Sequence, residues 1–281
     1  MVLIAACQSA PTTIPITVLP PSPARSFLPF GPFHWPESEF GEPFTGAFRS
    51  LRPQDAISLL EAARAAGTPL IINLAGGRRS FQEASGAFSP EKFKERLDLF
   101  KGIDFDSYVA DGTIIGHMLF DEAHDPSNWN RRAVPYADIE AAAAYSHQLW
   151  PDMPTGVGSP PGFLMDGAPW KSLDFAFAQY TERRGDIKKW SDEQVRDAHQ
   201  SGLALVLSLN VLHGNNGGAV AASQLRTWGV TLAEESYACA LLMWKYDEED
   251  DGAYFRDPAI VEAVTAIGQA ARERKAPACK Q

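Results

Sequence analysis

Short apolar segments alternate with helical patterns along almost the whole chain, and this alternation limits the fold more than any other feature. A strand, a crossover helix and a second strand build a parallel sheet, because the crossover returns the chain to the same end of the sheet. A doubly wound open sheet usually has a glycine-rich phosphate loop after its first strand, whereas Gly76-Gly77 follows the second predicted strand. The pattern therefore favours an α/β fold with a closed sheet.

Seven strands are predicted, and an eighth must come from residues 27–34 or from a segment read wrongly. With eight strands, residues 27–275 form one (β/α)8 TIM-type barrel domain, followed by a polar tail at 276–281. A chain of 281 residues with 45% hydrophobic content can bury the core of one such domain. The predicted strands are residues 44–48, 70–74, 114–120, 155–157, 173–179, 203–211 and 237–244, and the predicted helices are 53–66, 90–100, 137–149, 192–200 and 258–272.

The first 26 residues are predicted to be a lipidated start and a tether. Ile4-Ala5-Ala6-Cys7 resembles the lipobox of bacterial lipoproteins, and Ser, Thr and Pro dominate the residues that follow. A lipid on Cys7 would be the only link to a membrane, and the expected location is the bacterial cell envelope or the outside of the cell. The alternative is a chance Ala-Ala-Cys in an ordinary terminus.

The net charge of -10 argues against a nucleic acid or an anionic membrane surface as partner, because both are negatively charged and bind proteins with positively charged surfaces. Cys239 lies in an apolar run and Cys279 in the polar tail. A disulfide between them is possible but is not implied by their spacing, so we expect both to be free, with Cys239 a small core residue.

The segment 114–120 ends abruptly on Asp121-Glu122, and this is the most informative chemical feature of the chain. Its apolar run predicts a strand that is buried on both faces. Barrel enzymes keep their catalytic groups at the carboxyl ends of such strands. The alternative is that these carboxylates only cap the turn before Pro126.

Polar and aromatic residues also follow the other predicted strands, where the ends should converge on one mouth. Aromatic rings stack on the apolar faces of sugars, while polar groups bind their hydroxyls, so the set predicts a carbohydrate site. Each residue taken alone could instead be a core or surface residue. The candidate substrate-binding residues are Arg49, Asn73, His117, Gln179, Tyr180, Asn210, Trp244 and Tyr246. The loop 213–218 could cover the rim, and Arg78-Arg79 could bind an acidic sugar or a phosphate.

The runs Gly116-His-Met-Leu-Phe-Asp-Glu122 and Met243-Trp-Lys-Tyr-Asp247 resemble those of (β/α)-barrel glycoside hydrolases. The resemblance implies glycoside hydrolysis by two carboxylates, with Glu122 as general acid/base. For its partner we consider Asp247 first, Glu182 second and Asp121 third. The better-known members place Asn rather than Asp before the acid.

Two other functions stay open from the sequence. One is a barrel that binds a glycan without cleaving it. The other is a metal-assisted hydrolase of esters or amides, since His117, Asp121, Glu122 and His124 are ligand types. Strict alternation along a strand puts His117 and Asp121 on one face and Glu122 on the other. No helical zinc motif is present, so neither a metal nor a cofactor is expected.

Overall fold

Eight parallel strands form one sheet that curls into a nearly closed barrel in the computed structural model, which describes residues 25–212, 218–246, 249 and 252–280. The order along the sheet is β1-β8-β7-β6-β5-β4-β3-β2. All seven neighbouring pairs are parallel. The strands are β1 (Phe30–Pro32), β2 (Ala47–Ser50), β3 (Leu70–Asn73), β4 (Ile114–Asp121), β5 (Thr155–Gly158), β6 (Phe175–Tyr180), β7 (Ala204–Asn210) and β8 (Ala238–Trp244).

The barrel closes between β1 and β2. Phe33, directly after β1, pairs in parallel with Phe48, and the His34 amide donates to the Phe48 carbonyl over 3.0 Å. At the other end of this seam a Cβ on Gly31 would lie 1.9 Å from the Gly46 carbonyl oxygen. Only a residue without a side chain permits that approach. The predicted (β/α)8 barrel is confirmed, and its eighth strand comes from within residues 27–34.

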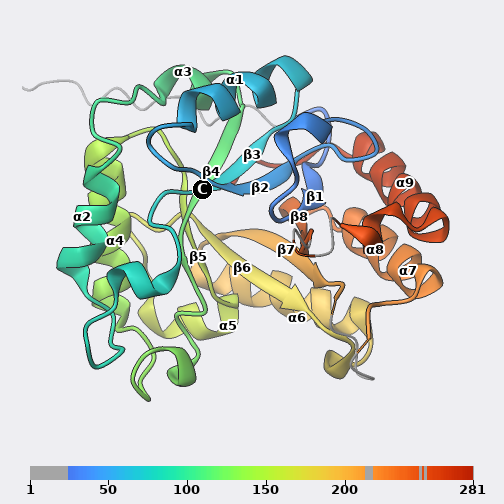
Figure 1. Cartoon of the computed structure of the whole chain (residues 1–281). Coiled ribbons are helices and arrows are strands. Elements are labelled where there is room, and N and C mark those ends of the chain that lie inside the picture. The colour runs from blue at the N-terminus through green and yellow to red at the C-terminus, as the bar shows by residue number, and fades with distance from the viewer. Residues whose placement is uncertain (1–24, 213–217, 247–248, 250–251, 281) are drawn as a thin grey trace, which may run out of the picture.

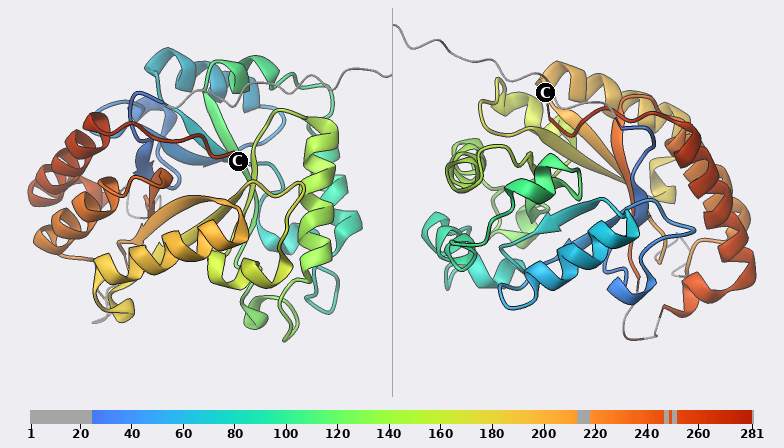
Figure 2. Two further views of the ribbon diagram at one scale, coloured as in Figure 1. Left: turned by 180° about the vertical axis from the view of Figure 1, so that it is seen from behind. Right: turned by 90° about the horizontal axis from the view of Figure 1, so that it is seen from above.

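Helices surround the strands on all sides, as Figures 1 and 2 show. The helices are α1 (Ala56–Ala66), α2 (Pro90–Asp98), α3 (Asp106–Ala110), α4 (Tyr136–Leu149), α5 (Pro161–Leu164), α6 (Ile187–Ser201), α7 (Ala222–Ala233), α8 (Ala253–Arg256) and α9 (Pro258–Glu273). The side chains of Ser89, Asp186 and Asp257 cap the starts of α2, α6 and α9. Gly67 and Gly202 end α1 and α6 in the left-handed conformation.

Two apolar clusters make up the core. The larger one fills the layer between the strands and the helices. The smaller one joins inward-facing residues of the strands, with Phe175 lying against Gly116 and Gly156. Because side chains fill the inside, the barrel is a packed core and only its ends can hold ligands.

The disulfide between Cys239 and Cys279 corrects the expectation that both cysteines are free. It joins the start of β8 to the last residues of the chain, which run from α9 across the amino-terminal end of the barrel (Figure 2, left). Arg25 pairs with Ala276 in an antiparallel bridge at the same end. The segment predicted as a polar tail therefore packs against the barrel as far as Lys280, with Cys279 buried.

The sequence does not predict helices α3, α5, α7 and α8. Helix α1 begins at Ala56 rather than at residue 53. Gly229, where a Cβ would lie 2.1 Å from the Ile267 side chain, lets α7 pack closely on α9. The predicted lipobox and most of the tether, residues 1–24, lie outside the described residues. None of the described helices is long and apolar enough to cross a bilayer.

Candidate functional site

A cavity of about 510 Å³ opens at the carboxyl ends of the strands. Its volume lies within the range of roughly 300–1,000 Å³ that is usual for small-molecule sites. It spans the arc from β8 through β1, β2 and β3 to β4. The lining residues are Phe33, His34, Phe48, Ser50, Asn73, Gly76, Gly77, Arg78, Arg79, Ser80, Phe81, Met118, Phe120, Asp121 and Trp244.

A bulge in β4 turns Asp121 toward this cavity. Met118 pairs with Gly156 and Asp121 with Gly158, so three steps along β4 match two along β5. One extra residue reverses the alternation of side chains beyond Met118. Both Met118 and Asp121 consequently line the cavity.

His117, which precedes the bulge, points away from the cavity toward the helices. Its side chain is fully buried, and its Nδ1 lies 2.9 Å from the Ser146 hydroxyl of α4, in the layer between strands and helices. Burial lowers the pKa of His117 to about 3, so the ring is neutral at physiological pH. The shared face for His117 and Asp121 that strict alternation predicts does not form, because the bulge lies between them.

Asn73 holds the bulge in place from β3. Its amide nitrogen donates to the carbonyls of Met118 and Leu119 over 2.9 and 3.2 Å, and its side-chain oxygen accepts from the Gly76 amide over 2.7 Å. One buried side chain thus fixes both the irregular part of β4 and the turn that follows β3. Asn73 lines the cavity, but both ends of its amide side chain are already bonded to the protein.

The Asp121 carboxyl group lies against the backbone of β5. A Cβ on Gly158 would be 2.1 Å from Asp121 Oδ1, so only glycine leaves room for the carboxyl there. Asp121 Oδ1 accepts from the Glu122 amide over 2.8 Å. Desolvation, with the nearby Glu122 charge as a smaller cause, raises the pKa of Asp121 from 3.8 to about 7. Asp121 is therefore a carboxylic acid that holds its proton near neutral pH.

Glu122 turns away from the cavity to its rim. Its backbone has a positive φ of 54°, and its side chain is 45% exposed. One carboxylate oxygen accepts from Arg78 Nη1 over 2.9 Å and from Asn128 over 2.7 Å. Of the two adjacent carboxylates, Asp121 faces the cavity and Glu122 forms an ion pair beside it.

Aromatic side chains form the opposite wall and part of the floor. The Trp244 ring packs edge-on against Phe33, with centroids 5.2 Å apart, and Phe33 stacks on Phe48. His34 adopts a positive φ of 64°. Arg49 donates to the backbone carbonyls of His34 and Trp35, so Arg49 shapes this wall from behind.

The remaining predicted residues lie away from the cavity. Tyr180 packs its ring on Trp190 and Trp228 in the helix layer. Tyr246 is buried against Trp35 and Phe255.

The polar candidates at the carboxyl ends of β6 and β7 also lie outside the cavity lining. Gln179 accepts a 3.5 Å hydrogen bond from Asn210 between the two strands, and Glu182 accepts from Gln224. Asp247 and loop residues 213–217 lie outside the described residues.

Sequence reasoning missed several lining residues, namely Phe33, His34, Phe48, Ser50 and Phe81. The first two follow β1, which the sequence placed only within residues 27–34. Nothing in the sequence separates Phe33 from the other buried phenylalanines, since it is the seam between β1 and β2 that places it at the cavity.

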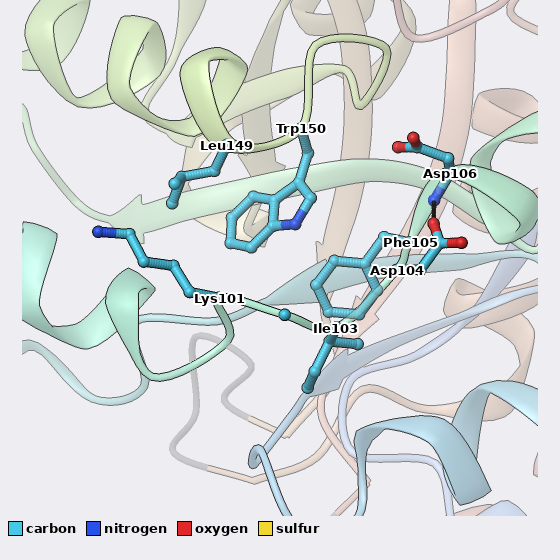
Figure 3. Close-up of a pocket in the computed structure, with 8 residues that line it drawn as sticks. Lys101, Ile103, Asp104, Phe105, Asp106, Leu149 and Trp150 are labelled. Atoms are coloured by element: carbon cyan, nitrogen blue, oxygen red, sulfur yellow. Dashed lines mark hydrogen bonds between the residues drawn. The ribbon is translucent and has the colours of Figure 1, made fainter.

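A second, smaller cavity of about 180 Å³ lies between the segment after α2 and the end of α4 (Figure 3). The Trp150 and Phe105 rings meet there edge to face, with centroids 5.3 Å apart, and Asp104 accepts from the Asp106 amide over 2.9 Å. These segments precede strands, so the cavity is at the end of the barrel remote from Asp121. Within the part of the chain that the structure describes, no three His, Cys, Asp or Glu side chains gather as a metal site.

Solved structures with the same fold include several glycoside hydrolases, although no family model and no curated protein matches the sequence. An endocellulase from Pyrococcus horikoshii in complex with cellotetraose has a TM-score of 0.54 at 11% identity, over 80% of this chain and 83% of that chain. The catalytic domain of the major endoglucanase from Xanthomonas campestris pv. campestris has a TM-score of 0.51 at 10% identity, over 86% and 94%. An endo-beta-1,4-xylanase from Gloeophyllum trabeum has a TM-score of 0.51 at 11% identity, over 85% and 96%.

A GH2 beta-galacturonidase from Eisenbergiella tayi bound to galacturonate has a TM-score of 0.58 at 7% identity, and this chain spans about half of it. Identities this low establish a shared architecture and leave the reaction open, because this barrel hosts many chemistries. The resemblance to barrel glycoside hydrolases is confirmed at the level of fold: the chain is a (β/α)8 barrel with a cavity at the catalytic end of that fold.

Proposed function

We propose that the cavity binds a carbohydrate and that the protein is a glycoside hydrolase in which Asp121 is the general acid. The observation that carries this proposal is the Asp121 carboxyl group itself. It lines the cavity, and burial raises its pKa to about 7. A general acid works best when its pKa lies near the operating pH, since it is then protonated and still acidic enough to give up the proton.

The cavity wall supports a sugar as the ligand. Trp244 offers a ring for stacking, and Ser50, Arg78 and Arg79 offer donors to hydroxyl groups. The glycoside hydrolases with the same fold act on carbohydrates according to their names, which favours this ligand class without determining it.

In the proposed reaction Asp121 gives its proton to the glycosidic oxygen as the bond from that oxygen to the anomeric carbon breaks. Water adds to the anomeric carbon, and its proton passes to the Glu122 carboxylate at the rim. Arg78 and Asn128 hold this carboxylate. The sequence predicts Glu122 as the acid and Asp121 as one of its possible partners. The proposal exchanges these two roles, because Asp121 faces the cavity and Glu122 does not line it.

A second candidate function is glycan binding without cleavage. Among the described lining residues Asp121 is the one carboxylate, and β7 ends on Asn210 rather than on an acid. A barrel that lost its second carboxylate would keep the aromatic wall and bind sugars. Turnover distinguishes the two functions.

We further propose that the protein works outside the cytosol, in the cell envelope or as a secreted protein. The Cys239–Cys279 disulfide supports an oxidising compartment. Anchoring through a lipid on Cys7 belongs to the same proposal. Mass spectrometry of the protein from its native cells would show a diacylglyceryl-modified Cys7 and a closed disulfide, and an intact residue 1 with two free thiols would refute both.

The test of the function is release of reducing ends from a panel of neutral and acidic oligosaccharides. We expect wild-type protein to cleave at least one of them, and Asp121→Asn to slow cleavage roughly 10²- to 10⁴-fold, the usual contribution of a general acid. Asp192→Asn, which removes an exposed carboxylate that pairs with Lys188 on α6, is the matched control and should leave the rate within about twofold. Binding of a glycan by wild type with no cleavage would establish the second candidate function instead.

A further inference from the structure

We infer that the cavity selects a glycan with a negatively charged unit, a uronic acid, whose carboxylate is bound by Arg79. This inference rests on the proposed function, because it names the class of sugar that the same cavity takes. Its starting observation is the sign of the charge at the cavity. Although the chain as a whole carries a net charge of -10, the charged side chains among the described lining residues are two arginines and Asp121.

Asp121 does not balance these arginines near neutral pH. Its raised pKa leaves a large share of the carboxyl groups protonated, and the charge of Arg78 is already matched by Glu122 at 2.9 Å. Arg79 is exposed on the cavity wall, and its side chain forms no hydrogen bond or ion pair with any other described residue. One guanidinium charge therefore remains for a ligand.

The segment that carries Arg79 is fixed in position. Gly76 is tied to Asn73, and Arg78–Phe81 form a short 3-10 helix whose Phe81 is buried among Phe93, Phe120 and Trp129. The backbone around Arg79 thus stays in place while its side chain reaches the cavity. A planar guanidinium can donate two parallel hydrogen bonds to one carboxylate, which favours a carboxylate over a hydroxyl group.

The other wall fits the same ligand. Trp244 lies on β8 and Arg79 follows β3, so the two groups border the cavity from the two ends of the β8-β1-β2-β3 arc. A sugar ring stacked on Trp244 can direct a carboxylate on C5 toward Arg79. A negative charge beside Asp121 also favours the protonated form of Asp121, so the ligand that Arg79 selects would keep the general acid protonated.

The experiment compares matched pairs of oligosaccharides by titration calorimetry on the full-length protein. Each pair is a uronic acid trimer and the neutral trimer made by reducing its carboxylates to primary alcohols, in several linkages. We expect wild type to bind the acidic member roughly 10- to 100-fold more tightly, the effect of one charge-assisted bidentate contact. We expect Arg79→Gln to abolish this preference and Arg79→Lys to retain part of it.

Arg226→Gln is the control, because it removes the same charge from the outer surface of α7, where Arg226 pairs with Glu262. It should keep the wild-type preference. Equal binding of both members by wild type, or a preference that survives Arg79→Gln, overturns the inference and leaves the proposed function standing. If a sulfated neutral sugar binds and the uronates do not, the uronic acid assignment is refuted. If no member of any pair binds, the proposed function fails as well.

Discussion

Replacing Asp121 by asparagine should make the folded protein more stable at pH 8 and leave its stability unchanged at pH 4. Burial raises the pKa of Asp121 from 3.8 to about 7 in the folded chain. Below pH 3.8 the carboxyl is protonated in both states and costs nothing. Between pH 3.8 and 7 the unfolded chain loses this proton while the folded chain keeps it, so the unfolded state binds fewer protons and stability falls as pH rises. Above pH 7 the penalty stays constant.

The full pKa difference corresponds to a penalty of about 4 kcal/mol. Asp121 lines an open cavity, where solvent screens part of this cost, so about 2 kcal/mol is the expected gain for Asp121→Asn at pH 8. The asparagine side-chain oxygen can still accept from the Glu122 amide, so the substitution removes the charge and little else.

Urea unfolding followed by tryptophan fluorescence at pH 4, 6 and 8 measures this difference. Asp125→Asn is the control of opposite sign. Hydrogen bonds from Ser127 lower the pKa of Asp125, so its ionised carboxylate stabilises the folded state. Replacing that carboxylate by an amide should therefore cost stability at pH 8 and less at low pH. If Asp121→Asn is no more stable than wild type at pH 8, the carboxyl is not desolvated and the argument for a neutral acid fails.

Three further substitutions test other parts of the structure. Replacing both Cys239 and Cys279 by alanine should cost about 4 kcal/mol of unfolding free energy, because the disulfide closes a chain separation of 40 residues; a loss below about 1 kcal/mol in urea unfolding would contradict this. Asn73→Ala removes three hydrogen bonds, two of them buried, and should cost roughly 2–4 kcal/mol. It should also bring the Asp121 carboxyl closer to its ordinary pKa in a carbon-13 NMR titration, and an unchanged titration would show that Asn73 does not position the bulge. Trp244→Ala should weaken glycan binding roughly tenfold through lost stacking, and undiminished affinity would place the sugar elsewhere.

The regular parts of the fold follow from the sequence because apolar runs mark them. The predicted strand at 70–74 matches β3, and the predicted helix at 90–100 matches α2, whose start is marked by Ser89 and Pro90. The eighth strand is harder to predict, since β1 has only three residues and no apolar run of its own marks it in the sequence. The disulfide could not be predicted, because its cysteines are 40 residues apart and only the fold brings them together.

The site is harder to predict from the sequence than the fold, and the reason is an irregularity within β4. The run that ends on Asp121-Glu122 correctly places two carboxylates at the end of β4. Which of them faces the cavity depends on a bulge that arises from pairing with β5 and from the side chain of Asn73. A single strand read by strict alternation cannot show such an irregularity.

The most direct test of the account is the dependence of the Asp121→Asn effect on the leaving group of the substrate. A general acid matters for a poor leaving group and little for a dinitrophenolate, which departs without a proton. On the glycan that wild type cleaves, we predict a loss of roughly 10²- to 10⁴-fold for the natural linkage and less than about tenfold for the dinitrophenyl glycoside. Equal losses on both substrates, or this pattern in Glu122→Gln instead of Asp121→Asn, would contradict the assignment of Asp121 as the acid.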